Sequence, residues 1–196
     1  LLTNDKYAWR FETEPQETLK GQRIYWPRGK VLGGSSALNG MAYVWGDPAE
    51  YDSWQQQGVT GWSFRDLLPY FKRLESNLHS NNPLRGRDGP VRISDRGATD
   101  RDRISDAYVA ACREEGIPDT PDYNAGSYEG VRYLEQTAWR GRRWSAAVAY
   151  LHPVRSRANL VVRTGALTRS IVIEGGRAVG VQYEAGGRLT RVHARR

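Results

Sequence analysis

Two adjacent glycines followed by two serines form the part of the chain whose residue types best suit chemistry. The run Gly33-Gly34-Ser35-Ser36 follows two basic residues and precedes a short apolar stretch. Glycine has no Cβ, so this backbone can adopt positive φ and approach a ligand closely. A serine here could cap a following helix, whose first N–H groups would then point outward. The pattern predicts a binding site for an anion such as a phosphate, although a plain strand-to-helix connection has the same pattern.

The elements around this turn are predicted from periodicity and capping residues. Residues 6–13 alternate aromatic and polar types, as a strand does. Asp47 before a proline starts one helix, and Ser63, with an acid three residues later, starts another. Pro69 is expected to kink or split this second helix. The polar stretch 77–88 predicts an exposed loop.

The second half of the chain changes from helix to strand patterns. Residues 101–115 predict an amphipathic helix whose apolar side runs through Ile104, Tyr108 and Cys112, and Ser145 predicts a short capped helix. Strands are then expected at 160–163, 167–173, 178–184 and 189–194. Gly-Gly pairs at 175–176 and 186–187 make the turns, which predicts an antiparallel meander.

Composition excludes several classes of protein. The 196 residues include 29 Lys and Arg against 22 Asp and Glu, a formal net charge of +7. The basic residues are spread along the chain without forming a stripe, so we favour a solvated surface with a pocket for an anionic cofactor over nucleic-acid binding. A single Cys112 permits no internal disulfide or cysteine-based metal site and suits a reducing compartment. The sequence contains no apolar run of about eighteen residues, so no transmembrane segment is predicted.

The string from Trp26 to Gly46 resembles the first signature of the glucose–methanol–choline (GMC) family of flavin-dependent alcohol oxidoreductases. Further similar segments follow in the family's order, and they lie at 47–54, 61–71, 88–91, 141–147, 159–167 and 175–181. The resemblance covers most of the chain and favours the choline dehydrogenase and alcohol dehydrogenase branch. The family's dinucleotide fingerprint and its catalytic histidine have no counterpart in this sequence, so the chain is interpreted as an internal fragment.

The resemblance implies an α+β fold related to α/β-type FAD-binding proteins. Residues 1–46 and 155–196 are expected to be FAD-domain segments, with the meander in the second. Residues 47–154 are expected to form a helical, loop-rich insertion on the substrate side.

The resemblance also implies a set of residues that line non-covalent FAD. They are Arg28, Val31, Gly33, Gly34, Ser35, Asn39, Gly40, Met41, Ala42 and Thr168. Backbone amides from Asn39 to Ala42 are expected near the flavin locus that accepts hydride. Asn39 could instead close a backbone turn, and Val31 and Met41 could be core residues. Trp26 occupies the position of the histidine that links FAD covalently in some members, so the resemblance implies no covalent link at this position.

The function implied is oxidation of an alcohol CH–OH group, with hydride passing from the alcohol carbon to flavin N5. Electrons would then pass to oxygen or a quinone-like acceptor, in a cytoplasmic setting. No catalytic residue and no metal ligand is expected in this chain; His79, His152 and His193 match no catalytic position. The alternatives are an inert fragment with at most a weak flavin or anion site and, less favoured, a basic nucleic-acid-binding module.

Overall fold

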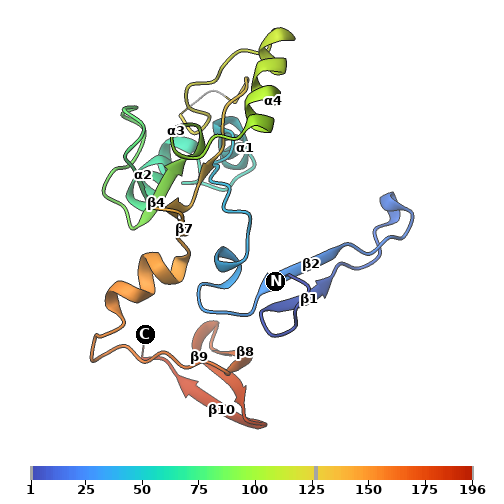
Figure 1. Cartoon of the computed structure of the whole chain (residues 1–196). Coiled ribbons are helices and arrows are strands. Elements are labelled where there is room, and N and C mark those ends of the chain that lie inside the picture. The colour runs from blue at the N-terminus through green and yellow to red at the C-terminus, as the bar shows by residue number, and fades with distance from the viewer. Residues whose placement is uncertain (1, 126–127, 196) are drawn as a thin grey trace. The chain divides into compact units, whose positions relative to one another are not determined.

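The computed structural model describes residues 2–125 and 128–195, and it contains two compact units (Figure 1). The first unit is Leu1–Val154 and the second is Arg155–Arg196. Each is described below by itself.

The first unit begins with a two-stranded hairpin. Strands β1 (Ala8–Glu12) and β2 (Tyr25–Gly29) pair antiparallel, with Ala8 opposite Gly29, and the 3₁₀ turn η1 (Glu17–Leu19) lies in the loop between them. The alternating pattern of residues 6–13 is thereby confirmed as a strand. The hairpin ends at Gly29, where the chain enters the glycine-serine run.

Two capped helices follow at the predicted positions. Helix α1 (Pro48–Gln56) begins at Asp47, whose carboxylate accepts the Ala49 N–H. Helix α2 (Phe64–Leu74) begins with a full capping box, in which two orphan amides of the first turn are satisfied reciprocally. Helix α2 continues unbroken through Pro69, so the proline does not split it.

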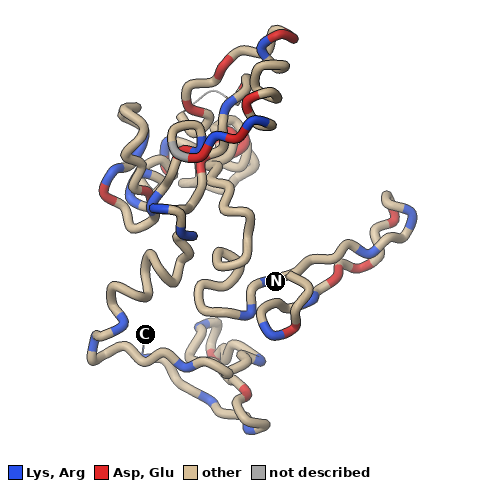
Figure 2. Tube along the Cα trace, viewed as in Figure 1, with Lys and Arg blue, Asp and Glu red and all other residues tan. Residues whose placement is uncertain are grey.

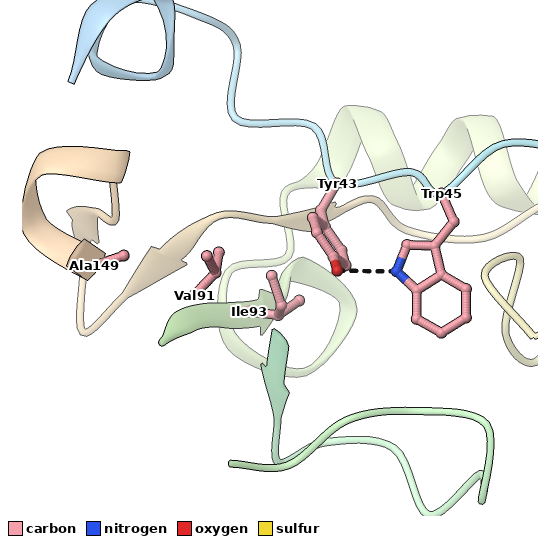
Figure 3. Packing of buried hydrophobic residues seen from close by; sticks show 5 residues of the cluster. All are labelled: Tyr43, Trp45, Val91, Ile93 and Ala149. Carbon is pink, nitrogen blue, oxygen red and sulfur yellow. Dashed lines mark hydrogen bonds between the residues drawn. The ribbon is translucent and has the colours of Figure 1, made fainter. Parts of the chain in front are cut away.

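A small mixed sheet carries the core of the first unit. Strand β3 (Glu75–Asn77) pairs parallel with β4 (Val91–Asp95), which pairs antiparallel with β5 (Glu135–Gln136). The buried cluster comprises Tyr43, Trp45, Val91, Ile93 and Ala149 (Figure 3). Four apolar side chains of α2 pack against it, which are those of Phe64, Leu68, Phe71 and Leu74. The apolar side of α2 therefore faces the core.

A second, smaller cluster lies under α4 (Arg103–Glu114), which follows the short helix α3 (Arg96–Thr99). Val109 and Cys112 are buried there. Ile104 and Tyr108 are 83% and 67% exposed, so the predicted apolar face is wrong for these two residues. The buried side is displaced toward Val109, which together with Cys112 packs against Val131 and Tyr133.

Short elements complete the first unit. Strands β6 (Ala138–Trp139) and β7 (Arg142–Arg143) form a tight hairpin, and one π-helical turn, η3 (Ala147–Leu151), leads into the 3₁₀ turn η4 (His152–Val154). The predicted short helix therefore exists, and Ser145 Oγ accepts the Val148 N–H at 3.4 Å.

The second unit is the antiparallel meander expected from the sequence. Strands β8 (Leu167–Glu174), β9 (Arg177–Ala185) and β10 (Arg188–His193) lie in the order β10-β9-β8. The Gly-Gly turns have positive φ at both glycines, as type I′ hairpin turns require. Residues 160–163 form no strand; that prediction is wrong, since no neighbouring backbone pairs with this segment.

The described chain thus mixes helices and strands and ends in antiparallel strands, which confirms the α+β fold class. Lys and Arg occur along the whole trace in both units (Figure 2). Among the described residues, no helix combines the length and the apolar character needed to cross a membrane.

Candidate functional site

Residues 28–42, named the signature loop here, connect β2 to the core of the first unit. Gly33 and Gly34 have φ of +88° and +56°, as the sequence predicted. A Cβ on Gly29 would lie 2.2 Å from the Gly34 carbonyl oxygen, and one on Gly33 would lie 3.2 Å from the Ala147 Cβ. The loop is therefore folded so tightly that side chains at Gly29 and Gly33 would displace it.

The serines act differently from the helix caps expected. The residues after Gly33 form only the four-residue 3₁₀ turn η2 (Gly34–Ala37), and no side chain caps it. Ser35 Oγ accepts the Gly29 N–H at 3.1 Å, whereas Ser36 Oγ accepts the Ala146 N–H at 2.9 Å. The capping prediction is wrong because both hydroxyls fasten the loop to neighbouring backbone segments.

Asn39 holds the second half of the signature loop. Its Oδ1 accepts the Met41 N–H at 3.1 Å and the Arg143 Nη1 at 2.7 Å. Arg143 Nη1 also donates to the Ser36 carbonyl at 3.2 Å. Asn39 therefore closes a backbone turn, which was the alternative interpretation, and Arg143 connects that turn to the Ser36 carbonyl.

Two of the four backbone amides from Asn39 to Ala42 lack an acceptor within the described chain. The Asn39 amide donates to the Ser35 carbonyl and the Met41 amide to the Asn39 side chain, but those of Gly40 and Ala42 donate to no described protein atom. Met41 between them has φ +66°, a conformation that non-glycine residues adopt rarely. The loop therefore presents two N–H donors to whatever lies against it.

The end of the loop is held as an additional strand beside β5. The Tyr43 N–H donates to the Glu135 carbonyl, and the Thr137 N–H donates to the Met41 carbonyl, each at 2.9 Å. Ala42 lies opposite Gln136 in an isolated antiparallel bridge. This pairing fixes the loop against the substrate-side insertion expected from the sequence.

A pocket of about 340 Å³ lies on the β2 side of the loop. Its lining includes Trp26, Arg28, Ser35, Leu38 and Asn39. The Arg28 guanidinium lies over the Trp26 ring at 5.2 Å. The pocket thus combines an apolar aromatic wall with one cation.

The remaining expected FAD-lining residues lie elsewhere. Val31 is half-buried, and its carbonyl accepts the Gly34 N–H at 2.8 Å. Met41 lines a second pocket, on the side of the β6–β7 hairpin. Thr168 is exposed on β8 in the second unit. The structure therefore brings together all of the predicted residues from Arg28 to Ala42 within one loop, and Thr168 belongs to the other unit.

A buried ionic network, named the Arg85 cluster, was missed by the sequence analysis. Arg85 donates to Glu75 at 2.9 Å, and to Asp122 and Glu135 at 2.7 Å each. The Arg85 and Glu75 side chains are 0% exposed. The prediction of an exposed loop over residues 77–88 is therefore wrong at Arg85, because three carboxylates from distant segments surround it. A lone arginine in a polar stretch gives no local signal of this.

The Arg85 cluster supports the segment that continues from the signature loop. Asn124 Nδ2 donates to Glu135 at 3.0 Å, and Asn124 Oδ1 accepts the Trp45 N–H at 2.7 Å. Burial and the charge of Glu75 raise the pKa of Tyr43. Burial opposes the charge of Arg85, but its hydrogen bonds to Glu75 and Glu135 outweigh this and raise its pKa. The cluster is therefore charged, hydrogen-bonded and structural in its contacts.

No group of three or more His, Cys, Asp or Glu side chains arranged to hold a metal ion occurs among residues 2–125 and 128–195.

The comparisons with known proteins agree with this geometry. The chain is 46% identical over all 196 residues to an oxygen-dependent choline dehydrogenase of Sinorhizobium fredii, and covers 35% of it. It is 43% identical over 193 residues to the human mitochondrial choline dehydrogenase, with 98% of the chain and 32% of the relative covered. An FAD-dependent oxidoreductase from Chaetomium thermophilum superposes with a TM-score of 0.86 at 30% identity, covering 96% of this chain and 35% of that one.

The chain spans about a third of the length of these relatives. A profile of the GMC oxidoreductases matches residues 14–196, which include the signature loop, the Arg85 cluster and the meander. The chain therefore belongs to the GMC oxidoreductase family.

Proposed function

We propose that this chain is the part of an FAD-dependent alcohol oxidoreductase that holds the cofactor against the substrate side. The observation that carries the proposal is the signature loop, in which the Gly40 and Ala42 amides are left without acceptors in the described chain. The membership of the GMC family and the likeness to choline dehydrogenases support the reaction class, oxidation of a CH–OH group.

The residues present fit a flavin dinucleotide. A close backbone approach is possible at Gly33 and Gly34, which carry no side chain and have positive φ. Arg28 and Trp26 in the 340 Å³ pocket offer a cation for a phosphate and a flat apolar surface for a ring. The fit is that of a polar, anionic and partly aromatic group, as FAD is.

Within this proposal, Arg28, Val31, Gly33, Gly34, Ser35 and the loop from Asn39 to Ala42 would hold the cofactor, and the role of Thr168 as a cofactor contact stays a prediction. When bound, FAD would supply the hydride acceptor for an alcohol carbon. The Gly40 and Ala42 amides would stabilise negative charge that develops against the loop, because fixed N–H donors need no reorganisation. Asn39 and Arg143 would hold those donors in place.

We propose that the cofactor is held without a covalent link. Trp26, at the position where some members carry a linking histidine, lies in β2 with its ring against Arg28. An indole has no free ring nitrogen comparable to that of imidazole. Oxygen is proposed as the electron acceptor of the complete protein, on the name of the Sinorhizobium fredii relative, and a quinone-like acceptor is the alternative.

The three segments are proposed to keep the roles expected for them. Residues 1–46 and 155–196 would belong to the FAD-binding side and 47–154 to the substrate side. The group that accepts the hydroxyl proton would lie outside this chain, so the isolated 196 residues would be inert.

The complete protein that contains this chain tests the proposal. Purified without added flavin, it is expected to show a flavin absorbance spectrum that bleaches when an alcohol is added anaerobically. The 196-residue chain alone is expected to leave the alcohol unchanged. A complete protein that never binds FAD would overturn the proposal.

A further inference from the structure

The larger pocket beside the signature loop is rich in arginine. It has a volume of about 760 Å³, and Met41 brings the loop into its lining. Its charged lining consists of Arg96, Arg140, Arg142 and Arg143 against a single carboxylate, Asp100, with His79 as the other titratable side chain. Four guanidinium groups facing one carboxylate leave an excess of positive charge.

Most of that charge is not neutralised within the chain. Arg96 pairs with Asp100 at 3.1 Å. In the part of the chain that the structure describes, Arg140, Arg142 and Arg143 form no ion pair. The strongest bond of Arg143 is to the neutral Asn39 side chain. Like charges held together are unfavourable unless an anion joins them, so this pocket is suited to an anionic ligand.

The β6–β7 hairpin holds two of these arginines at its tip. Arg140 and Gly141 form the two-residue turn and have φ of +49° and +72°. Such a type I′ turn favours Asn-Gly, so arginine is an unfavourable choice at its first position. The Arg92 and Arg140 guanidinium groups lie 5.5 and 6.0 Å from the Trp139 ring. Arg140 of the tip and Arg92 of β4 thus both lie against the Trp139 ring.

The arginine pocket adjoins the proposed cofactor site without being part of it. It shares no lining residue with the 340 Å³ pocket. The two are connected by the loop itself, since Asn39 lines the smaller pocket, Met41 the larger, and Arg143 bonds Asn39 from the larger. A ligand in the arginine pocket would therefore contact the signature loop at Met41.

We propose that the arginine pocket binds the anionic group of the substrate, so that the enzyme oxidises an alcohol carrying a carboxylate or a phosphate. The inference rests on the proposed function, whose substrate it narrows. Planar guanidinium groups bind the oxygens of either anion through paired N–H donors. A quaternary ammonium alcohol such as choline would meet like charge here, and one tryptophan already covered by arginines provides no aromatic cage for it.

The inference is tested by calorimetric titration of the complete protein, as purified, which measures the affinity for each probe and does not depend on catalytic activity. The probes are 3-hydroxypropanoate, glycerol phosphate, choline and 1,3-propanediol, at low salt and again at about 150 mM salt. Both anions, or one of them, should bind at least about tenfold more tightly than choline and the diol. Added salt should weaken this preference. The anion that binds more tightly identifies the source as a hydroxy acid or a phosphorylated alcohol.

Arg140→Asn is the sharpest variant, because it removes a guanidinium while placing the favoured Asn-Gly pair in the turn. It should weaken anion binding by about tenfold. Arg142→Gln should act in the same direction. The matched control is Arg65→Gln, since Arg65 is exposed on α2, outside this pocket; it should leave anion binding unchanged.

Equal or tighter binding of choline would overturn the inference, as would equal losses from Arg140→Asn and Arg65→Gln. A flavin protein that oxidises alcohols without preferring anions would overturn this inference alone. Anion binding that depends on Arg140, in a protein without flavin, would support the anion site and overturn the proposed function.

Discussion

The signature loop and the Arg85 cluster are neighbours in the first unit, but they are held together in opposite ways. No residue from 28 to 42 is buried, and neutral side chains of the loop (Ser35, Ser36 and Asn39) maintain it by hydrogen bonds to nearby backbone, to the Ala146 amide and to Arg143. The Arg85 cluster is fully enclosed, and charged side chains from segments far apart in sequence maintain it. The loop keeps donors open for a ligand, whereas the cluster satisfies every donor internally.

Because of this difference, mutations in the two regions are expected to affect different properties, stability for the cluster and cofactor binding for the loop. Changes in the cluster are expected to lower the free energy of unfolding, because they leave buried charges uncompensated. Changes in the loop are expected to lower the affinity for the cofactor while leaving the core intact. The following four changes test that separation, in order of decreasing effect.

Arg85→Met is expected to have the largest effect. It would leave the carboxylates of Glu75, Asp122 and Glu135 buried without their shared cation, at a cost of about 3–5 kcal/mol. Denaturant unfolding of the complete protein measures it, with Arg65→Met on exposed α2 as the control. A loss similar to that of the control would show that the cluster contributes little to stability.

Gly29→Ala is expected to damage the loop more than the core. The new Cβ would lie 2.2 Å from the Gly34 carbonyl oxygen and 2.7 Å from the Ser35 nitrogen, so η2 must move. FAD affinity should fall by at least about tenfold, the equivalent of about 1.4 kcal/mol. The control is Gly61→Ala, which lies outside the loop and adds no contact within 4 Å; its positive φ costs folding stability, so only the FAD affinities of the two variants are compared. If both variants bind FAD equally well, the close approach at Gly29 has no part in binding.

Tyr123, whose hydroxyl accepts the Glu135 N–H, is expected to make the stability around the Arg85 cluster depend on pH. Burial raises its pKa from 10.0 to about 12, so the folded state holds this proton more strongly than the unfolded state. The stability it contributes is present below pH 10 and is lost as the pH rises from 10 to 12, by about 1.4 kcal/mol per pH unit. Tyr123→Phe should make the alkaline unfolding curve shallower. An unchanged slope would contradict the assignment.

Asn39→Ala is expected to have the smallest effect. It removes the acceptor of the Met41 N–H and of Arg143, and one such bond contributes about 1 kcal/mol. FAD should bind about fivefold more weakly, with little change in unfolding. Asn39→Asp keeps the acceptor oxygen, so it should restore the turn; equal losses in both variants would show that the turn is not what matters.

How much the sequence could predict follows from the same contrast. Local signals located the capping box at Ser63, the meander turns and the glycines with positive φ, because each depends on residues a few positions apart. The Arg85 cluster depends on partners 10, 37 and 50 residues away, and no local pattern encodes such pairing. The serines were misassigned for the same reason, since Ser36 bonds Ala146 across the fold.

The exposed side of α4 is a further feature that local sequence patterns did not predict. Periodicity finds an apolar stripe but not which part of it meets a neighbour, and Ile104 lies outside the contact that buries Val109. The role of Arg143 was missed although its segment was noticed, because the bond to Asn39 joins residues 104 positions apart.

Hydrogen–deuterium exchange of the complete protein, with and without FAD, tests the central claim most directly. If the signature loop holds the cofactor, the amides of Gly40 and Ala42, which have no acceptor in the described chain, should exchange more slowly when FAD is bound. The amides around Arg85 should be slow in both states. Unchanged exchange from Arg28 to Ala42, with FAD-dependent protection elsewhere in the chain, would contradict the account.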